Sequence, residues 1–165
     1  MTEEKLQRAQ RTFKTLCQNL DEHKWHYEKD EENLEIECSA RGEDLPMDIR
    51  IIVHADRQLI ILLSVMPFIA PDTKRLDVAI ATSIVNNKLV DGSFDYDVTS
   101  GHMVFRMTSS FIESEIDSEV FTYMLMVSCH TIDEYNDKFF MLGKGMLSIN
   151  QFLEVGFVTK SYLFC

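Results

Sequence analysis

Residues 71–105, PDTKRLDVAIATSIVNNKLVDGSFDYDVTSGHMVF, decide the fold, because a helix pattern changes into a strand pattern within them. Residues 75–90 place apolar side chains on one stripe of a 3.6-residue helix: Leu76, Ile80, Ala81, Ile84, Val85 and Leu89. Asp91-Gly92 ends the helix, since glycine takes the left-handed cap conformation without steric cost. Residues 93–98 then alternate polar and apolar side chains, and residues 102–107 carry apolar residues at every second position beyond a Thr99-Ser100-Gly101 turn. The pattern predicts a helix followed by a β-hairpin.

The part of the chain before this unit predicts one helix and three strands. Residues 3–26 carry an apolar stripe of helical period, and the charged residues 29–33 indicate a loop. Residues 34–40 and 47–54 alternate as strands with one wet face do. Residues 58–66 are rich in leucine and isoleucine, which predicts a central strand covered on both faces over part of its length.

The part after the hairpin predicts two helices. The first runs from Ser118 to Leu142, with an apolar stripe at Phe121, Met124, Leu125, Ser128, Ile132, Tyr135, Phe139 and Leu142. Ser148 and Gln151 have the spacing of a capping box, which predicts a short helix over 149–155. The resulting order, α-β-β-β-α-β-β-α-α, predicts one α+β domain over residues 1–165, with an antiparallel sheet of about five strands packed against helices.

Composition limits the classes of function. The formal net charge is −11, so most of the surface repels nucleic-acid phosphates and anionic membranes. The chain has no apolar run long enough to span a membrane and no signal-peptide pattern, so we expect a cytoplasmic protein. The four cysteines are far apart and form no C-x-x-C pair, which indicates separate thiols.

Candidate catalytic and metal-binding residues are few. His23 and His26 lie about one helical turn apart, but no further metal ligand is close in sequence. Asp95 and Asp97 share one face of a strand, and the alternation predicts that this face is in water. Neither a P-loop nor a Gly-x-Ser-x-Gly motif is present. We therefore expect no catalytic residues, no cofactor and no metal.

The element order and several short motifs resemble the YbjN family of bacterial proteins. The resemblance covers about residues 30–154 and rests on Ile84-Val85-Asn86-Asn87-Lys88-Leu89, on Gly92-Ser93-Phe94-Asp95, and on the segment from Asp133 to Phe152. The family is similar in fold to the type III secretion chaperones (Tir-chaperone-like). The resemblance implies a non-enzymatic regulator of sensory or stress responses, or a chaperone-like homodimer that binds a client protein.

Apolar residues of the predicted hairpin, the long helix and the tail suggest where a partner binds. The methionines suit either irregular cores or surfaces that bind varied partners, and residues 157–165 form an apolar tail that we expect to pack on the domain or on a partner. The candidate partner-binding residues are Met103, Phe105, Met107, Met124, Phe157, Tyr162 and Phe164. The alternative hypothesis is a small-ligand sensor or enzyme with a pocket between sheet and helices.

Overall fold

Six antiparallel strands form one sheet in the order β1-β2-β3-β4-β6-β5 in the computed structural model, which describes residues 2–155. The strands are β1 (Tyr27–Asp30), β2 (Glu35–Arg41), β3 (Pro46–His54), β4 (Leu59–Ile69), β5 (Ser93–Tyr96) and β6 (His102–Ser110). The helices are α1 (Glu3–Glu22), the 3-10 turn η1 (Asp72–Lys74), α2 (Arg75–Asn86), α3 (Ser118–Gly143) and α4 (Ile149–Val155). The predicted α+β class with an antiparallel sheet is confirmed.

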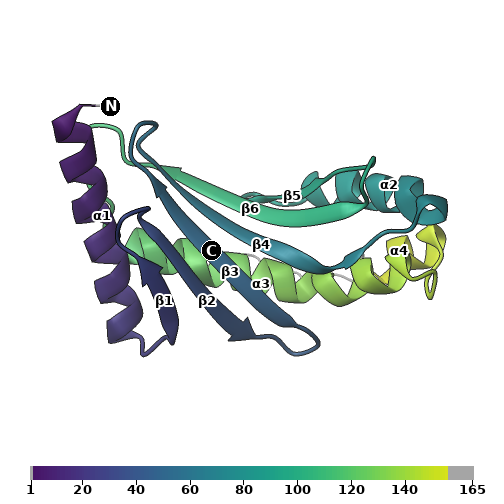
Figure 1. Cartoon of the computed structure of the whole chain (residues 1–165). Coiled ribbons are helices and arrows are strands. Elements are labelled where there is room, and N and C mark those ends of the chain that lie inside the picture. The colour runs from purple at the N-terminus through teal and green to yellow at the C-terminus, as the bar shows by residue number, and fades with distance from the viewer. Residues whose placement is uncertain (1, 156–165) are drawn as a thin grey trace.

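The helices within residues 2–155 cover one face of the sheet and leave its other face open (Figure 1). The long helix α3 packs on β3, β4 and β6, while α1 packs on β3 and α2 on β5. Strand residues that point toward these helices are buried, as in the series Ile36, Ile49, Ile60 and Phe105, which are 0–2% exposed. The core therefore lies in a single layer between sheet and helices.

One strand was not predicted. The structure pairs Tyr27 with Cys38 and Asp30 with Glu35, so β1 is an edge strand where the sequence indicated a loop from residue 29. The first helix correspondingly ends at Glu22 rather than at residue 26. The sequence of β1, Tyr-Glu-Lys-Asp, has no apolar alternation that would predict a strand. It is a strand only because it pairs with β2.

The helix α2 is shorter than predicted, and its buried face is only partly the predicted one. It ends at Asn86, and Leu76 and Ile80 of the predicted stripe are 73% and 50% exposed. Ala81 and Val85 of the predicted stripe are buried, and Val78 and Thr82 complete the buried face. An apolar sequence with two possible stripes does not show which of them will meet the sheet.

The end of α2 is determined by a contact with the edge strand β5. The Asn86 side chain donates through Nδ2 to the Phe94 carbonyl at 2.9 Å and accepts from the Phe94 N–H at 2.8 Å. It thus fills the place of a neighbouring strand on the outer edge of β5. Gly92 has a positive φ of 75°, and a Cβ there would lie 2.4 Å from the Phe105 ring.

The C-terminal elements agree with the sequence patterns. The helix α3 begins at Ser118, where the Asp117 side chain accepts from the Glu119 N–H at 2.8 Å. All eight residues of its predicted stripe are buried. The capping box also forms, with Ser148 N–H donating to Gln151 Oε1 at 2.9 Å and Gln151 N–H to Ser148 Oγ at 3.2 Å.

Candidate protein-binding surface

The four predicted partner-binding residues that the structure describes lie in the core. Met103, Phe105 and Met107 of β6 are 0%, 0% and 5% exposed, and Met124 of α3 is 2% exposed. Every second residue of β6 points at the helices, so these side chains have the core-filling role rather than a surface role. Phe157, Tyr162 and Phe164 lie outside the described residues.

A different apolar surface runs along the open face of β4. Alternate residues of this strand point away from the helices, and the six of them, which we call the β4 stripe, are Leu59, Ile61, Leu63, Val65, Pro67 and Ile69. Val65 and Ile69 are 59% and 53% exposed. The predicted central position of β4 is confirmed, but the described helices cover only one of its faces, so the cover predicted on both faces over part of its length is not found within residues 2–155.

Neighbouring strands extend the β4 stripe sideways. Ile52 of β3 pairs with Ile61, and Val104 of β6 pairs with Val65. Both flanking side chains are half-buried. Contiguous apolar surface of this kind, bordered by polar residues, is typical of a binding face.

Two arginine–carboxylate pairs border the stripe on opposite sides. Arg50 of β3 and Arg106 of β6 both pair with Leu63 in the ladder. Arg50 Nε donates to Glu35 Oε2 at 3.1 Å, and Arg106 Nε donates to Asp95 Oδ2 at 2.5 Å. Exposed pairs of this kind contribute at most about 1 kcal/mol each, so their effect is to hold charged groups beside an apolar strip.

Next to this stripe the sheet divides into two parts that we call arms, one bordered by β3 and the other by β4. The ladder between β3 and β4 runs only from His54↔Leu59 to Arg50↔Leu63, although both strands continue beyond it. Residues 46–49 of β3 pair with β2 alone, while Ser64, Val65 and Ile69 of β4 pair with β6 alone, with a register shift between Val65 and Ile69. We call the space between these two segments the β3–β4 gap. Figure 1 shows the two strands diverging from their common turn, with α3 behind them.

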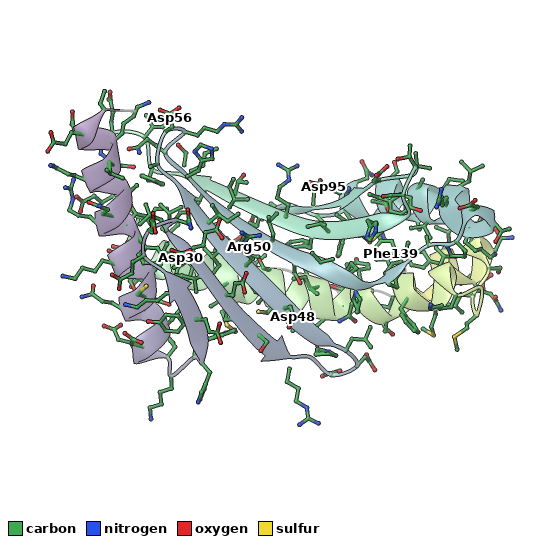
Figure 2. All side chains as sticks on the ribbon, viewed as in Figure 1. Asp30, Asp48, Arg50, Asp56, Asp95 and Phe139 are labelled. Atoms are coloured by element: carbon green, nitrogen blue, oxygen red, sulfur yellow. The ribbon has the colours of Figure 1, made fainter. Side chains whose placement is uncertain are left out.

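A groove with a volume of about 980 Å³ opens at this gap. Its apolar lining includes Ile49 of one arm and Val65 and Met66 of the other. Its charged lining consists of Glu28, Glu37, Asp48 and Arg50. Arg50 already contacts Glu35 and Glu37, so the groove carries an excess of negative charge. Asp48 and Arg50 lie along the β3 arm that borders the gap (Figure 2).

A contact from α3 holds the tip of the β2–β3 arm. Asp133 Oδ1 accepts a hydrogen bond from the Glu43 N–H at 2.9 Å, across 90 residues of sequence. The neighbouring Gly42 leaves no room for a side chain, since a Cβ would lie 2.1 Å from Asp133 Oδ1 and 2.6 Å from the Leu45 carbonyl oxygen. This contact, which we call the Asp133 latch, ties the β2–β3 turn at the end of one arm to α3.

The surroundings of Cys38, Cys129 and His23 give these side chains structural rather than catalytic roles. Burial raises the pKa of Cys38 to about 12 and that of Cys129 to about 11, so both are uncharged thiols at neutral pH. His23 Nδ1 contacts the Asn19 carbonyl oxygen at 2.8 Å. Residues 2–155 contain no group of three or more His, Cys, Asp or Glu side chains that could hold a metal ion.

The two predicted acidic residues of the hairpin have surface roles. Asp95 forms the pair with Arg106. Asp97 lies in the turn, where its carboxylate accepts from the Thr99 N–H at 2.8 Å and from the hydroxyls of Thr99 and Ser100, both at 2.6 Å. These bonds stabilise the charged form and lower the pKa of Asp97. The two carboxylates do not form an acid–base pair.

The fold defines a class: an α+β protein whose antiparallel sheet carries all its packed helices on one face. A structure of this class that is similar to the chain is YbjN from E. coli, described as a candidate transcription regulator. The similarity has a TM-score of 0.56 at 15% sequence identity and covers 75% of this chain and 87% of that protein. The predicted resemblance to YbjN is thus confirmed at the level of fold.

Comparisons of the sequence itself with protein-family models and with curated proteins find no match. Among the described helices, none has the length and apolar character that crossing a membrane requires.

The sequence predicts that this strand ends at Met66, because Pro67 cannot donate a hydrogen bond to a ladder, whereas β4 continues through Pro67 to Ile69. Residues 59–69 are apolar at both odd and even positions, so periodicity alone could not show that one face is open. Pro67 lies inside the strand, however, and proline is tolerated there only at an edge or a bulge. The structure places a register shift between Val65 and Ile69, next to the β3–β4 gap.

Proposed function

We propose that this chain is a non-enzymatic protein-interaction module that binds an extended apolar segment of another protein over the β4 stripe. The observation that carries the proposal is the stripe itself, six alternate apolar residues on a sheet face that no described helix covers. Burying an exposed valine, leucine or isoleucine contributes about 1.5–3 kcal/mol. Val65 and Ile69, each about half exposed, therefore offer a few kcal/mol to a partner that covers them.

The role of this module would be regulatory or chaperone-like, in the cytoplasm. YbjN is described as a candidate transcription regulator, and a net charge of −11 makes direct contact with DNA unfavourable. We therefore propose that the chain acts through protein contacts. We also propose a homodimer, as the resemblance to secretion chaperones implies, and sedimentation equilibrium at micromolar concentration tests it. A monomeric mass would contradict the dimer without affecting the segment-binding proposal.

Affinity capture with matched variants tests the binding surface. The test variant combines Leu63→Asp and Val65→Asp in the β4 stripe. The control combines Leu76→Asp and Val90→Asp, which change the same residue types at positions that are 73% and 95% exposed and lie outside the sheet. Circular dichroism verifies that both variants fold.

We expect a protein captured stoichiometrically from the native host's lysate by the wild type and by the control to be lost from the stripe variant. Equal capture by all three proteins would refute the stripe as the binding surface.

A second candidate function, a small-ligand sensor, has one observation in its favour. The buried Asn136 Nδ2 on α3 and Ser64 Oγ on β4 have no hydrogen-bond partner within the described part of the chain. Buried polar groups normally have partners, so a polar ligand between sheet and helices would satisfy them. A thermal-shift screen of metabolites checks this function, because a ligand specific to the folded state raises the melting temperature.

A further inference from the structure

We propose that the β3–β4 gap takes one extended peptide segment as an inserted strand, and that the segment alternates apolar residues with Lys or Arg. This inference rests on the proposed function and names the chemistry that recognises the partner. The segments of the two arms that border the gap, residues 46–49 and 64–69, belong to extended strands. Their other edges pair with β2 and, apart from the register shift at residues 66–68, with β6. An inserted segment as long as residues 64–69 of β4 would have six residues and a length of roughly 20 Å.

Backbone groups of both arms point into the gap. Alternate residues of an antiparallel strand direct their N–H and C=O groups to opposite edges. On β3, Val53 N–H donates toward β2, to Leu34 O at 3.0 Å, so the even-numbered Asp48 faces β4. On β4, the carbonyl of Gln58 accepts from Phe111 N–H on the β6 side at 2.9 Å, so the odd-numbered Val65 faces β3. A strand between Asp48 and Val65 would find hydrogen-bonding groups on both sides.

Two prolines limit how the gap can be filled. Pro46 of β3 and Pro67 of β4 lie in the two free segments and have the same parity as Asp48 and Val65. Each lacks the N–H that would otherwise point into the gap. The arms therefore cannot close fully on each other through a regular ladder, whereas their carbonyl groups can still accept bonds from an inserted segment.

The side chains around the gap define an alternating specificity. Ile49 and Met66 point to the helix side and are buried, at 2% and 3% exposed. Asp48 of β3 lies on the opposite, open face of the sheet. Glu37 of the neighbouring strand β2 lies on the same open face. Successive side chains of an inserted strand also point to opposite faces. One set would meet Ile49 and Met66, which favours apolar residues, and the other set would meet carboxylates, which favours Lys or Arg.

Binding of a synthetic peptide tests the inference. The probe is a fluorescein-labelled peptide with three Val-Lys repeats, measured by fluorescence anisotropy against the full chain. Its controls are a Val-Glu version, a version with the valines and lysines in separate blocks, and a version N-methylated at alternate residues. We expect only the alternating Val-Lys peptide to bind, because only it has the charge, the period and the backbone donors that the gap requires.

Protein variants locate the site. Asp48→Lys reverses a charge in the groove, and Glu22→Lys makes the same change at an exposed position on α1. Because an exposed ion pair contributes up to about 1 kcal/mol, we expect Asp48→Lys to weaken binding about fivefold and Glu22→Lys to leave it unchanged. Hydrogen exchange should slow in residues 46–49 and 64–69 when the probe binds.

Three results would overturn the inference. The first is equal binding of the N-methylated probe, or no added exchange protection in the two segments. The second is a dimer that dissociates as the probe binds, which would assign the gap to a second copy. The third is tighter probe binding when Phe157→Asp and Phe164→Asp are introduced, which would assign it to the chain's own C-terminal residues.

Failure of this inference is distinguishable from failure of the proposed function. If the captured protein is lost from the Leu63→Asp/Val65→Asp variant but bound normally by Asp48→Lys, the stripe binds a partner without strand insertion. If neither variant affects capture, the proposed function itself is wrong.

Discussion

Replacing Gly42 with alanine should loosen the arm of the sheet that borders the β3–β4 gap. The new Cβ would lie 2.1 Å from Asp133 Oδ1 and 2.6 Å from the Leu45 carbonyl oxygen, so both neighbours must move. Overpacking of this kind costs about 1–3 kcal/mol, and loss of the Glu43–Asp133 hydrogen bond costs about 1 kcal/mol. Reduced entropy of the unfolded chain returns about 0.4–1 kcal/mol. The net loss of stability is about 2 kcal/mol.

Urea unfolding of Gly42→Ala, Asp133→Ala and the double variant measures this effect. We expect the single alanine at Gly42 to lower the free energy of unfolding by about 2 kcal/mol, which corresponds to a decrease of about 4–8 °C in the melting temperature measured in a thermal melt. The effects of the two substitutions should not be additive, because Asp133→Ala removes one of the two clashes made by the new Cβ. The double variant should therefore be about 1 kcal/mol more stable than the summed losses of the two single variants predict. A neutral or stabilising Gly42→Ala, with an additive cycle, would refute the Asp133 latch.

Three further predictions follow from described contacts. Phe139→Ala should cost about 3–5 kcal/mol in urea unfolding, since its fully buried ring lies 5.1 Å from Phe94; a loss under 1 kcal/mol would contradict this packing. Asn86→Ala removes both hydrogen bonds to Phe94 and should lower stability by about 1–2 kcal/mol and increase aggregation, measured by unfolding and light scattering. Burial raises the pKa of Cys38 to about 12 and of Cys129 to about 11, above the ordinary 9.0, so the unfolded chain loses these protons first. The contribution of these two thiols to stability should therefore be constant below pH 9 and fall between pH 9 and 11, by up to about 1.4 kcal/mol per pH unit for each thiol, and the slope in that range should decrease when both are replaced by alanine.

The elements that could be predicted from sequence are those whose local pattern and tertiary role agree. The helix α3 is the best case: its apolar repeat continues from Phe121 to Leu142, through most of the 26-residue helix, so one face is marked as the face that meets the sheet. The β5–β6 hairpin is similar, because every second residue of each strand is apolar, including Phe94 and Phe105, and a glycine turn lies between the strands. In these elements periodicity alone identifies the buried side.

The elements that were missed depend on partners distant in sequence. The charged strand β1 exists only because β2 pairs with it. The end of α2 depends on the bonds between Asn86 and Phe94, and its buried face depends on which side meets β5 and α3. The candidate site is the most non-local feature, since the gap results from the point at which one ladder stops. No window of sequence contains that information.

The position of the open backbone inside the sheet has a consequence for stoichiometry. The outer edge of β5 is occupied by the Asn86 side chain, and the other outer strand, β1, is four residues long and carries three charges. An outer edge regenerates itself each time a strand is added, which is how sheets grow into fibres. A gap bounded by two strands is consumed by the first strand that enters it. Recognition there would saturate at one segment per chain, and the complex would have no tendency to polymerise.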